Sequence, residues 1–400
     1  MQDRQYQARP LGPPLPERIA PLRVLQVASG DLWGGAEAQV VELSRALRET
    51  YGVSVAAAVL NTGQLAEALA TAGVPTTVLD ESHLSSVTIL QRIRAMIRTV
   101  RPAIVHTHRR KENVLGGTAA RLCGVPSVRT VHGRMELVEP PLRLDKQAYA
   151  LLDRWAGKRC QAAVIAVSSE LAGSLTQDYP PERICIIRNG ISAGYVRMAA
   201  VAEPQIPNSG NRIRLAYLGR LVPVKRVDRL IQAFRILLNC APDEFALFII
   251  GDGPERDALI RLAERLGVSA NVHFLGHRAD PHACLGRMEI VLLASEHEGL
   301  PMAALEALSL GIMPVVPPVG GLPELLEAAQ FGKIAKSSSP EDLAAAVLDG
   351  AASVRPCSAF SRLPERWSIE YSAQMHIQLY RAVLRRDPCP AAAVRELEAR

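Results

Sequence analysis

The chain of 400 residues contains no run of about 18 consecutive apolar residues, the length that a membrane-spanning helix requires. We therefore predict no transmembrane helix. Residues 1–21 are polar, with several prolines and no apolar segment. They lack the pattern of a secretory signal, and we expect them to form a flexible tail. These features favour a cytoplasmic protein.

Paired cysteines and clustered metal ligands are also missing. None of the seven cysteines belongs to a CxxC pair, and Asp252 is not part of a DxD pair. We interpret the cysteines as reduced, mostly structural thiols. The sequence therefore predicts neither a metal site nor a bound cofactor.

What the sequence does contain is a regular alternation of apolar runs and segments with helical spacing. The hydrophobic fraction of 48% is sufficient for packed cores, and the length suggests about two or three domains. Strands are expected at 24–28, 53–60, 76–79, 104–106, 128–131, 163–167, 213–218, 245–250, 272–275, 290–294 and 314–316. Helices are expected at 36–47, 64–72, 85–100, 143–159, 228–238, 301–311, 341–348 and 366–384. Repeated strand–helix units predict an α/β fold of parallel sheets covered by helices on both faces.

The stretch from Ile290 to Gly311 combines an apolar strand, a polar loop and a helix. Backbone N–H groups near Leu300 to Met302 would start the helix without intrahelical partners, and such a terminus attracts anions. Glu298 in the loop and Glu306 in the helix place a carboxylate on either side of this phosphate seat. The chemistry suits a ligand that carries both phosphate and hydroxyl groups, such as a nucleotide sugar.

Further polar residues follow the ends of other expected strands, where ligands bind in open parallel sheets. The glycines Gly34 and Gly35, the cluster of His108, Arg109, Arg110 and Lys111, and His132 lie at such positions in the first half. In the second half, Arg220 and Lys225 share a loop in which they could clamp a diphosphate.

Several motifs occur together in one order: Gly219-Arg220 with Lys225, the turn Gly251-Asp252-Gly253, the segment EGLPMAALE from Glu298 to Glu306, and GGLPE from Gly320. This combination strongly resembles the large family of retaining glycosyltransferases with two facing Rossmann-like domains, the GT-B architecture of the group 1 and family 4-like enzymes. The resemblance covers roughly residues 22–380.

The resemblance implies a nucleotide-sugar donor, here expected to be a UDP-sugar, and transfer without a metal ion. It implies that Glu306 holds the ribose, Glu298 holds the donor sugar, and His132 lies beside that sugar. The expected catalytic residues are His132, Arg220, Lys225 and Glu298. The expected donor-binding residues are Gly34, Gly35, Gly219, Gly251, Gly253, Leu275, Gly299, Leu300, Pro301, Met302 and Glu306. Acceptor contacts are expected from His108 and Arg109.

The domain division follows from the same pattern. We expect an N-terminal acceptor domain over 22–191 and a nucleotide-sugar domain over 212–365, joined by a linker over 192–211 that has little periodicity. A helix over 366–385 would cross back to the first domain, and 386–400 would form a flexible tail.

Two positions depart from the family pattern. Met288-Glu289 replaces the usual alanine–aspartate pair before the strand at Ile290, and Pro317-Pro318 replaces a segment that usually holds threonine or serine. We expect the first change to be structural. The second could stiffen the loop near the donor, and it leaves the donor's identity open.

Charge is distributed unevenly. Residues 1–200 carry 24 Lys and Arg against 17 Asp and Glu, a net charge of +7, while residues 201–400 carry 22 against 23, a net charge of −1. Two helices in the first half are basic; their cations are Arg92, Arg94, Arg98 and Arg101 in one, and Lys146, Arg154, Lys158 and Arg159 in the other. Such helices could meet an anionic membrane surface, although ordinary solvated helix faces would look the same.

The expected acceptor is therefore a glycan or a lipid-linked sugar in cell-surface polysaccharide or glycolipid synthesis. We expect no nucleic acid partner, and a peripheral place at the inner face of the membrane. Alternatives remain open: a sugar-nucleotide epimerase on the same fold, a non-catalytic sugar-nucleotide-binding protein, or a glycosidase that uses Glu298 and Glu306 as its carboxylate pair. A dinucleotide-dependent oxidoreductase is disfavoured, because no GxGxxG fingerprint is present.

Overall fold

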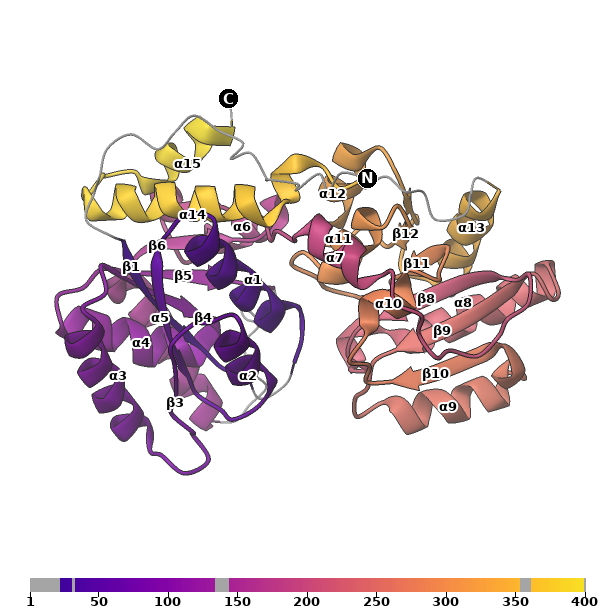
Figure 1. Cartoon of the computed structure of the whole chain (residues 1–400), viewed down its shortest axis with the longest axis horizontal. Coiled ribbons are helices and arrows are strands. Elements are labelled where there is room, and N and C mark those ends of the chain that lie inside the picture. Colours follow the sequence, from indigo (N-terminus) through magenta and orange to yellow (C-terminus); the bar gives the residue numbers. More distant parts are fainter. Residues whose placement is uncertain (1–21, 31–32, 134–143, 353–360, 399–400) are drawn as a thin grey trace, which may run out of the picture.

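The computed structural model describes residues 22–30, 33–133, 144–352 and 361–398, and it shows two α/β units side by side (Figure 1). The tail expected over residues 1–21 lies outside the described residues. Within them, no helix combines the length and the apolar character needed to cross a bilayer.

The first unit is built on a seven-stranded sheet with the order β3-β2-β1-β4-β5-β6-β7, in which neighbouring strands are parallel. Its strands are β1 (Arg23–Ala28), β2 (Ser54–Val59), β3 (Thr76–Val78), β4 (Ile104–His108), β5 (Ser127–Val131), β6 (Gln161–Ala166) and β7 (Ile184–Ile186). Its helices are α1 (Gly35–Glu49), α2 (Gln64–Thr71), α3 (Ser86–Val100), α4 (Arg109–Leu122), α5 (Leu144–Cys160) and α6 (Ser169–Leu175).

The second unit repeats this plan with six parallel strands in the order β10-β9-β8-β11-β12-β13. Its strands are β8 (Ile213–Leu218), β9 (Phe245–Ile250), β10 (Val272–Gly276), β11 (Ile290–Leu292), β12 (Met313–Val316) and β13 (Lys333–Ile334). Its helices are α8 (Val227–Cys240), α9 (Arg256–Arg265), α10 (Pro281–Leu285), α11 (Met302–Ser309), α12 (Leu322–Ala329) and α13 (Pro340–Ala351). Each sheet reverses its strand order once, as in doubly wound folds. This topology confirms the expected α/β fold of parallel sheets covered by helices.

Helices cover both faces of each sheet because the strands are apolar on both sides. All six residues of β9 are buried, which is typical of parallel strands between helical layers. In the first unit, α3, α4 and α5 form one layer, and α1 lies on the opposite face with α14 (Ile369–Leu384). The α8 sequence places its apolar residues on one stripe, and that stripe is buried.

The chain passes between the two units twice, and the two passages lie side by side. Ile191 on the outward path donates its backbone N–H to the Trp367 carbonyl and accepts from the N–H of Ile369 on the return path, and Trp367 is fully buried. After this crossing α14 lies along the first unit (Figure 1).

Two segments differ from the sequence-based expectation. The expected linker over 192–211 contains a helix, α7 (Ala193–Ala199), which Ser192 caps and which packs on α10 and α11. The expected flexible tail over 386–400 was wrong for residues 390–398, which form α15 (Pro390–Glu398) with Ala391 and Val394 buried against the first unit. Short helices with few apolar positions carry too weak a periodic signal to be recognised from sequence alone.

The returning helix is attached by a buried hydrogen bond between Tyr380 and His106 Nδ1 of β4, at 2.7 Å. We predict that Tyr380→Phe lowers the free energy of unfolding by about 1–3 kcal/mol, since it leaves a buried ring nitrogen without its partner. Tyr51→Phe is the matched control, because the Tyr51 hydroxyl donates to the Glu370 carbonyl of the same helix at an exposed position. Chemical denaturation should show a loss below about 1 kcal/mol for the control. Equal losses in the two variants would contradict the assignment.

Candidate active site

The candidate site lies where the carboxyl ends of the two sheets face each other. The loop after β11 reaches the residues that follow β5, so that a Cβ at Gly299 would overlap the carbonyl oxygen of His132. Glycine is therefore required at position 299 by close backbone approach. Asn189, which is buried, donates its side-chain amide to the Leu300 carbonyl at 3.0 Å and ties the same loop to the chain crossing.

Glu298 is held by two donors. Lys225 Nζ lies 2.6 Å from Glu298 Oε1, and Ser295 Oγ donates to the same oxygen at 2.6 Å. The Glu298 side chain is only 8% exposed, while that of Lys225 is 26% exposed. A carboxylate at this depth needs a compensating charge, and Lys225 supplies it. The ammonium keeps an accessible side from which it can meet an anion.

Arg220, on the same loop as Lys225, lies against the first unit. Its Cδ is 3.5 Å from the position of a Cβ on Gly34, and Gly35 similarly faces Met302 Cγ at 3.2 Å. The backbone of Arg220 is fixed, because the buried Tyr217 hydroxyl donates to its carbonyl at 2.7 Å. Among the described residues, no hydrogen bond or ion pair is recorded for its guanidinium. Gly34 and Gly35 of the first unit thus lie directly against Arg220 and Met302 of the second unit.

The turns after β8, β9 and β10 form one continuous edge. Gly251 N–H donates to the Gly276 carbonyl at 2.8 Å, directly after Leu275, and Leu221 N–H donates to the Asp252 carbonyl at 2.9 Å. The backbones of Gly219 and Gly251 come so close that a Cβ at Gly251 would overlap the Gly219 carbonyl. This edge presents backbone rather than side chains, which suits a flat ligand such as a nucleobase. Gly253, at the same turn, packs against the backbone of Leu221.

Glu306 lies on α11, which begins one residue after Pro301. Its Oε1 is 3.4 Å from Nε2 of His282, the second residue of α10. Its Oε2 is buried and has no hydrogen-bond partner among the described residues. The sequence analysis missed His282, because nothing in the spacing of α10 and α11 predicts that they lie side by side.

His132 belongs to a stack of buried imidazoles. Its Nε2 lies 3.0 Å from His108 Nδ1, and His108 Nε2 lies 2.8 Å from Gln26 Oε1. His106 and His376 continue the stack, with ring centroids 5.6 Å apart. Burial lowers the pKa of His132 to about 3 and that of His376 to about 4, and it lowers the pKa of His106 and His108 well below the usual range. The four rings are therefore neutral near pH 7. The side chain of His108 lies behind His132 rather than at the surface.

Arg109 and its neighbours at the start of α4 each have an acidic partner. Arg109 pairs with the buried Glu37 of α1, and Lys111 pairs with Glu81. Ser29, after β1, donates to the fully buried Glu112. These acids follow different strands, so the sequence analysis had no signal that would place them together. Paired charges at a sheet edge can bind hydroxyl groups of a ligand as donors and as acceptors.

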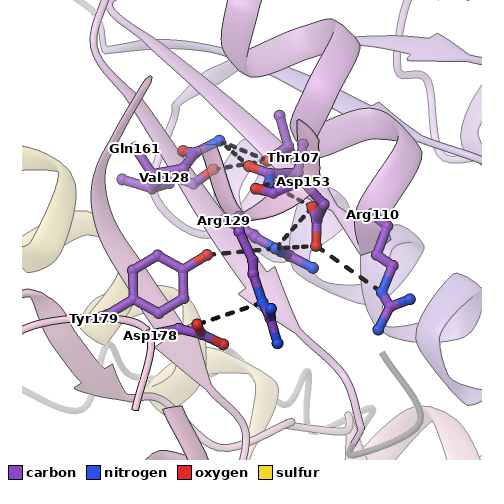
Figure 2. Close-up of polar contacts among 10 residues, drawn as sticks. Thr107, Arg110, Val128, Arg129, Asp153, Gln161, Asp178 and Tyr179 are labelled. Carbon is purple, nitrogen blue, oxygen red and sulfur yellow. Dashed lines mark hydrogen bonds and ion pairs between the residues drawn. The ribbon is translucent and has the colours of Figure 1, made fainter. Parts of the chain in front are cut away.

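A second polar network fixes α5 beneath the same edge. Figure 2 shows the buried Arg129 of β5 donating to both carboxylate oxygens of Asp153 in α5, at 3.1 and 3.2 Å. Asn113 of α4 donates to the Asp153 carboxylate at 2.6 Å, and Arg110 lies 3.9 Å from it. The position of α5 is therefore set relative to the start of α4, where Arg109 to Lys111 lie.

The two departures from the family pattern have local explanations. Met288 is buried, and the Glu289 carboxylate accepts from the Arg214 backbone N–H at 2.7 Å and from its guanidinium Nε at 3.1 Å, which joins β8 to the start of β11. Pro317 follows β12, and its carbonyl accepts from Val319 N–H at 2.9 Å. Over the described residues, no group of three or more His, Cys, Asp or Glu side chains is arranged to hold a metal ion.

Comparison with known proteins identifies this arrangement. Residues 33–194 match the profile of Glycosyltransferase Family 4, and residues 201–350 match that of Glycosyl transferases group 1. The glycogen synthase of Mycobacterium tuberculosis is 31% identical over 314 residues, which are 75% of this chain and 74% of that protein. The chain belongs to the group 1 glycosyltransferases. It is therefore an enzyme that transfers a sugar from a nucleotide-sugar donor, as the resemblance predicted.

Other relatives are named as enzymes with different substrates. The D-inositol 3-phosphate glycosyltransferase of Segniliparus rotundus is 28% identical over 323 residues, 74% of this chain and 70% of that protein. Among solved structures, Anabaena HepE in complex with UDP superposes with a TM-score of 0.69 at 20% identity, over 94% of this chain and 99% of that one. At this identity the likeness confirms the GT-B fold of the glycosyltransferase.

The neutral histidine stack predicts acid sensitivity. A histidine whose pKa is depressed in the folded state binds its proton only on unfolding, so stability is full above the unfolded value of about 6.5 and falls as pH drops below it. Each such histidine contributes a slope of at most about 1.4 kcal/mol per pH unit. We expect His376→Leu to reduce the loss of stability between pH 6.5 and 4, measured by denaturant unfolding at each pH. The exposed His83 is the control, and His83→Ala should leave the slope unchanged. A wild-type slope in His376→Leu would contradict the neutral stack.

Proposed function

We propose that this glycosyltransferase is a retaining enzyme that uses a UDP-sugar and transfers the sugar to a glycan or a lipid-linked acceptor. The observation that carries the proposal is the Lys225–Glu298 pair, in which Lys225 shares the loop after β8 with Arg220, the residue that faces Gly34 of the first unit. The crystal structure of the structural relative HepE, which holds UDP, supports the choice of nucleotide.

The donor would lie mainly on the second unit. Arg220 and Lys225 neutralise the diphosphate, and the start of α11 after Leu300 and Pro301 adds backbone N–H groups from Met302 onward. Glu298 accepts from a hydroxyl of the donor sugar, while Glu306 accepts from the ribose. The backbone edge formed by Gly219, Gly251, Gly253, Leu275 and Gly276 receives the base, and Gly299 keeps the sugar pocket close to His132.

The same pair suggests how transfer begins. Lys225 is paired with Glu298, and a diphosphate would give the ammonium a second anionic partner. As the bond between sugar and diphosphate breaks, negative charge grows on the leaving group, and fixed cations stabilise that charge more than the ground state. Arg220 and Lys225 then do the electrostatic work that a metal ion does in other transferases.

The acceptor would enter along the first unit. His132 would face the donor sugar with its ring held by His108, and Gly34 and Gly35 let the two units approach each other closely. Arg109, paired with Glu37, lies at the entrance. Closure of the two units around both substrates would exclude water and limit hydrolysis of the donor.

We propose the corresponding domain division. The acceptor domain comprises residues 22–191, the donor domain residues 212–365, and α7 lies within the connecting segment 192–211. Residues 366–385 return to the acceptor domain, and α15 completes it.

Two alternatives predict different products. A sugar-nucleotide epimerase would convert the donor without any acceptor, and a non-catalytic binding protein would bind UDP-sugar without releasing UDP. UDP release that requires an acceptor, with the same anomeric configuration in donor and product, supports retaining transfer. Conversion of the donor alone would overturn it.

The role of Glu298 predicts a split between two ligands. Glu298→Gln should weaken binding of the full UDP-sugar but change UDP binding much less, because UDP lacks the sugar that Glu298 is proposed to hold. Isothermal titration calorimetry with each ligand separates the two effects, and loss of a hydrogen bond to a charged acceptor is worth about 1.5–3 kcal/mol. Equal weakening of both ligands would show instead that Glu298 affects binding of the diphosphate, through its pair with Lys225.

Lys225 should matter more for turnover than for affinity. Lys225→Ala is expected to lower kcat at saturating donor by about 10²–10³-fold, the usual cost of losing one preorganised electrostatic contact. Arg220→Lys keeps the charge but loses the two-pronged geometry, so it should also impair turnover. Circular dichroism would confirm that each variant folds. A wild-type kcat in folded Lys225→Ala would remove Lys225 from the reaction.

A lipid-linked acceptor is supported by the outer face of α5. Leu151, Leu152 and Trp155 are 64%, 49% and 47% exposed, and the exposed cations Lys158 and Arg159 follow them in the same helix. Exposed apolar and basic side chains on one helix suit an anionic membrane surface, and α3 adds Arg92, Arg98 and Arg101 to the same layer.

We predict that the enzyme co-sediments with vesicles containing anionic lipid and that binding weakens as salt rises, because surface charge is screened. Trp155→Ser should reduce binding to the vesicles. Val201→Ser should not, although Val201 is a 77% exposed apolar residue, because it lies on the second unit's side of the chain crossing. Binding that is absent at low salt, or that both variants reduce equally, would argue for a water-soluble acceptor such as a small phosphorylated polyol.

A further inference from the structure

One histidine of the second unit has a place that the proposed mechanism does not use. His282 lies at the start of α10 with its Nε2 3.4 Å from Glu306 Oε1, and its side chain is 18% exposed against 13% for Glu306. Because Glu306 Oε2 is buried without a partner among the described residues, the carboxylate is held at one oxygen and has the other available. A buried acceptor atom without a partner indicates a place where a ligand donates a hydrogen bond.

On its other side, His282 faces the first unit. The ring of Tyr195 in α7 meets it edge-on, with centroids 6.1 Å apart and planes at 90°. The guanidinium of Arg45 in α1 lies over the Tyr195 ring at 5.4 Å, and Arg45 Nη1 is 2.9 Å from Glu42 Oε1. His282 therefore lies between the helix that carries Glu306 and the first helix of the opposite unit.

The charges around His282 favour its protonated form. Burial lowers its pKa, but the hydrogen bond to Glu306 and the charges of Glu306 and Glu42 outweigh burial, so that the pKa is raised above the usual value. Arg45 and Tyr195 are the other ionisable groups that face it from α1 and α7. An imidazolium would donate a charge-assisted hydrogen bond to Glu306, which is stronger than a neutral one.

We propose that His282 is a positioning residue for the nucleotide part of the donor: it fixes one oxygen of Glu306 so that the other is ready to accept from the ribose hydroxyls. The inference rests on the proposed ribose contact of Glu306. Without the tether, the Glu306 side chain would have to be immobilised when the donor binds, and that ordering costs affinity. With the contact to His282, the Glu306 side chain is already ordered in the folded protein before the donor binds.

The test compares UDP with its 2′,3′-dideoxy analogue, which lacks the ribose hydroxyls. His282→Ala is expected to weaken UDP binding about 3- to 10-fold, the worth of one hydrogen bond, and to leave the dideoxy analogue unaffected. His282→Gln keeps a side-chain N–H donor and should restore most of the affinity. In the double variant with Glu306→Gln, replacing His282 should cost nothing further. His83→Ala is the control, since His83 is exposed in the first unit, remote in sequence from α10 and α11.

Two further measurements separate positioning from a merely structural contact. His282→Ala should raise the donor KM while kcat at saturation stays near wild type. The advantage of wild type over His282→Ala for UDP should also shrink as pH rises through and above the raised pKa of His282, because the imidazolium then loses its proton.

Other outcomes would overturn the inference. Equal weakening for both nucleotides, an additive loss in the double variant, or UDP binding unchanged by His282→Ala would each reject positioning through Glu306 while leaving the donor assignment intact. A wild-type enzyme that binds UDP and the dideoxy analogue equally would instead reject the ribose contact of Glu306, and the role of His282 with it. Absence of UDP binding in the wild type would overturn the proposed donor itself.

Discussion

The structure depends on one close approach, where the loop after β11 touches the residues after β5. Gly299 lies against the His132 carbonyl, and the Leu300 carbonyl receives the Asn189 side chain. On the far side of the loop, Gly321 N–H donates to the Gly299 carbonyl at 2.7 Å, and Glu170 accepts from Gly320 N–H at 2.6 Å. Backbone atoms from both units thus meet with no room for a side chain between them, which fixes how near a donor on one sheet can come to an acceptor on the other.

Around that contact, three cations of the site are held by acids of their own chain. Lys225 pairs with Glu298, Arg109 with Glu37 and Lys111 with Glu81. Pairing at a partly buried edge keeps long basic side chains ordered and reduces indiscriminate binding of anions. In the proposed function a sugar diphosphate would suit such pairs, with its phosphates near the cations and its hydroxyl groups donating to the acids.

Much of this could be predicted from the sequence, and the reason is the same in each case. A buried parallel strand such as Phe245–Ile250 is apolar on both faces, and a helix such as Val227–Cys240 carries its apolar residues on one stripe. Each element can therefore be recognised from its own short stretch of sequence. The glutamates and basic residues of the second unit were predicted as site residues because they occur along the chain in the order of a known family pattern, and their roles stay predictions. The family and the GT-B fold followed from these signals.

The features that could not be predicted are contacts between segments that lie far apart in the sequence. His282 and Asn189 act through partners 24 and 111 residues away, and neither lies in a periodic pattern that would point to them. In the sequence, Glu37 and Glu112 look like ordinary helix residues. In the fold they are buried beside Arg109 and Ser29. The helix α15 is short, and its three buried residues, Pro390, Ala391 and Val394, give no recognisable stripe. Polar contacts of this kind follow from the tertiary fold, and no local propensity specifies them.

The return of the chain has a consequence for the order in which the protein is made. The face of the first sheet that carries His106 is completed only by Tyr380, 274 residues later. Until the second unit has been synthesised, α1 covers this face without α14, so the residues that pack on α14 lack part of their apolar contacts. Contacts of such high sequence separation form slowly, and exposed apolar surface invites aggregation during the delay. The second unit, whose sheet lies within one continuous segment, can fold while the first is still incomplete. The N-terminal half is therefore the first part of the enzyme to be synthesised and the last to complete its core.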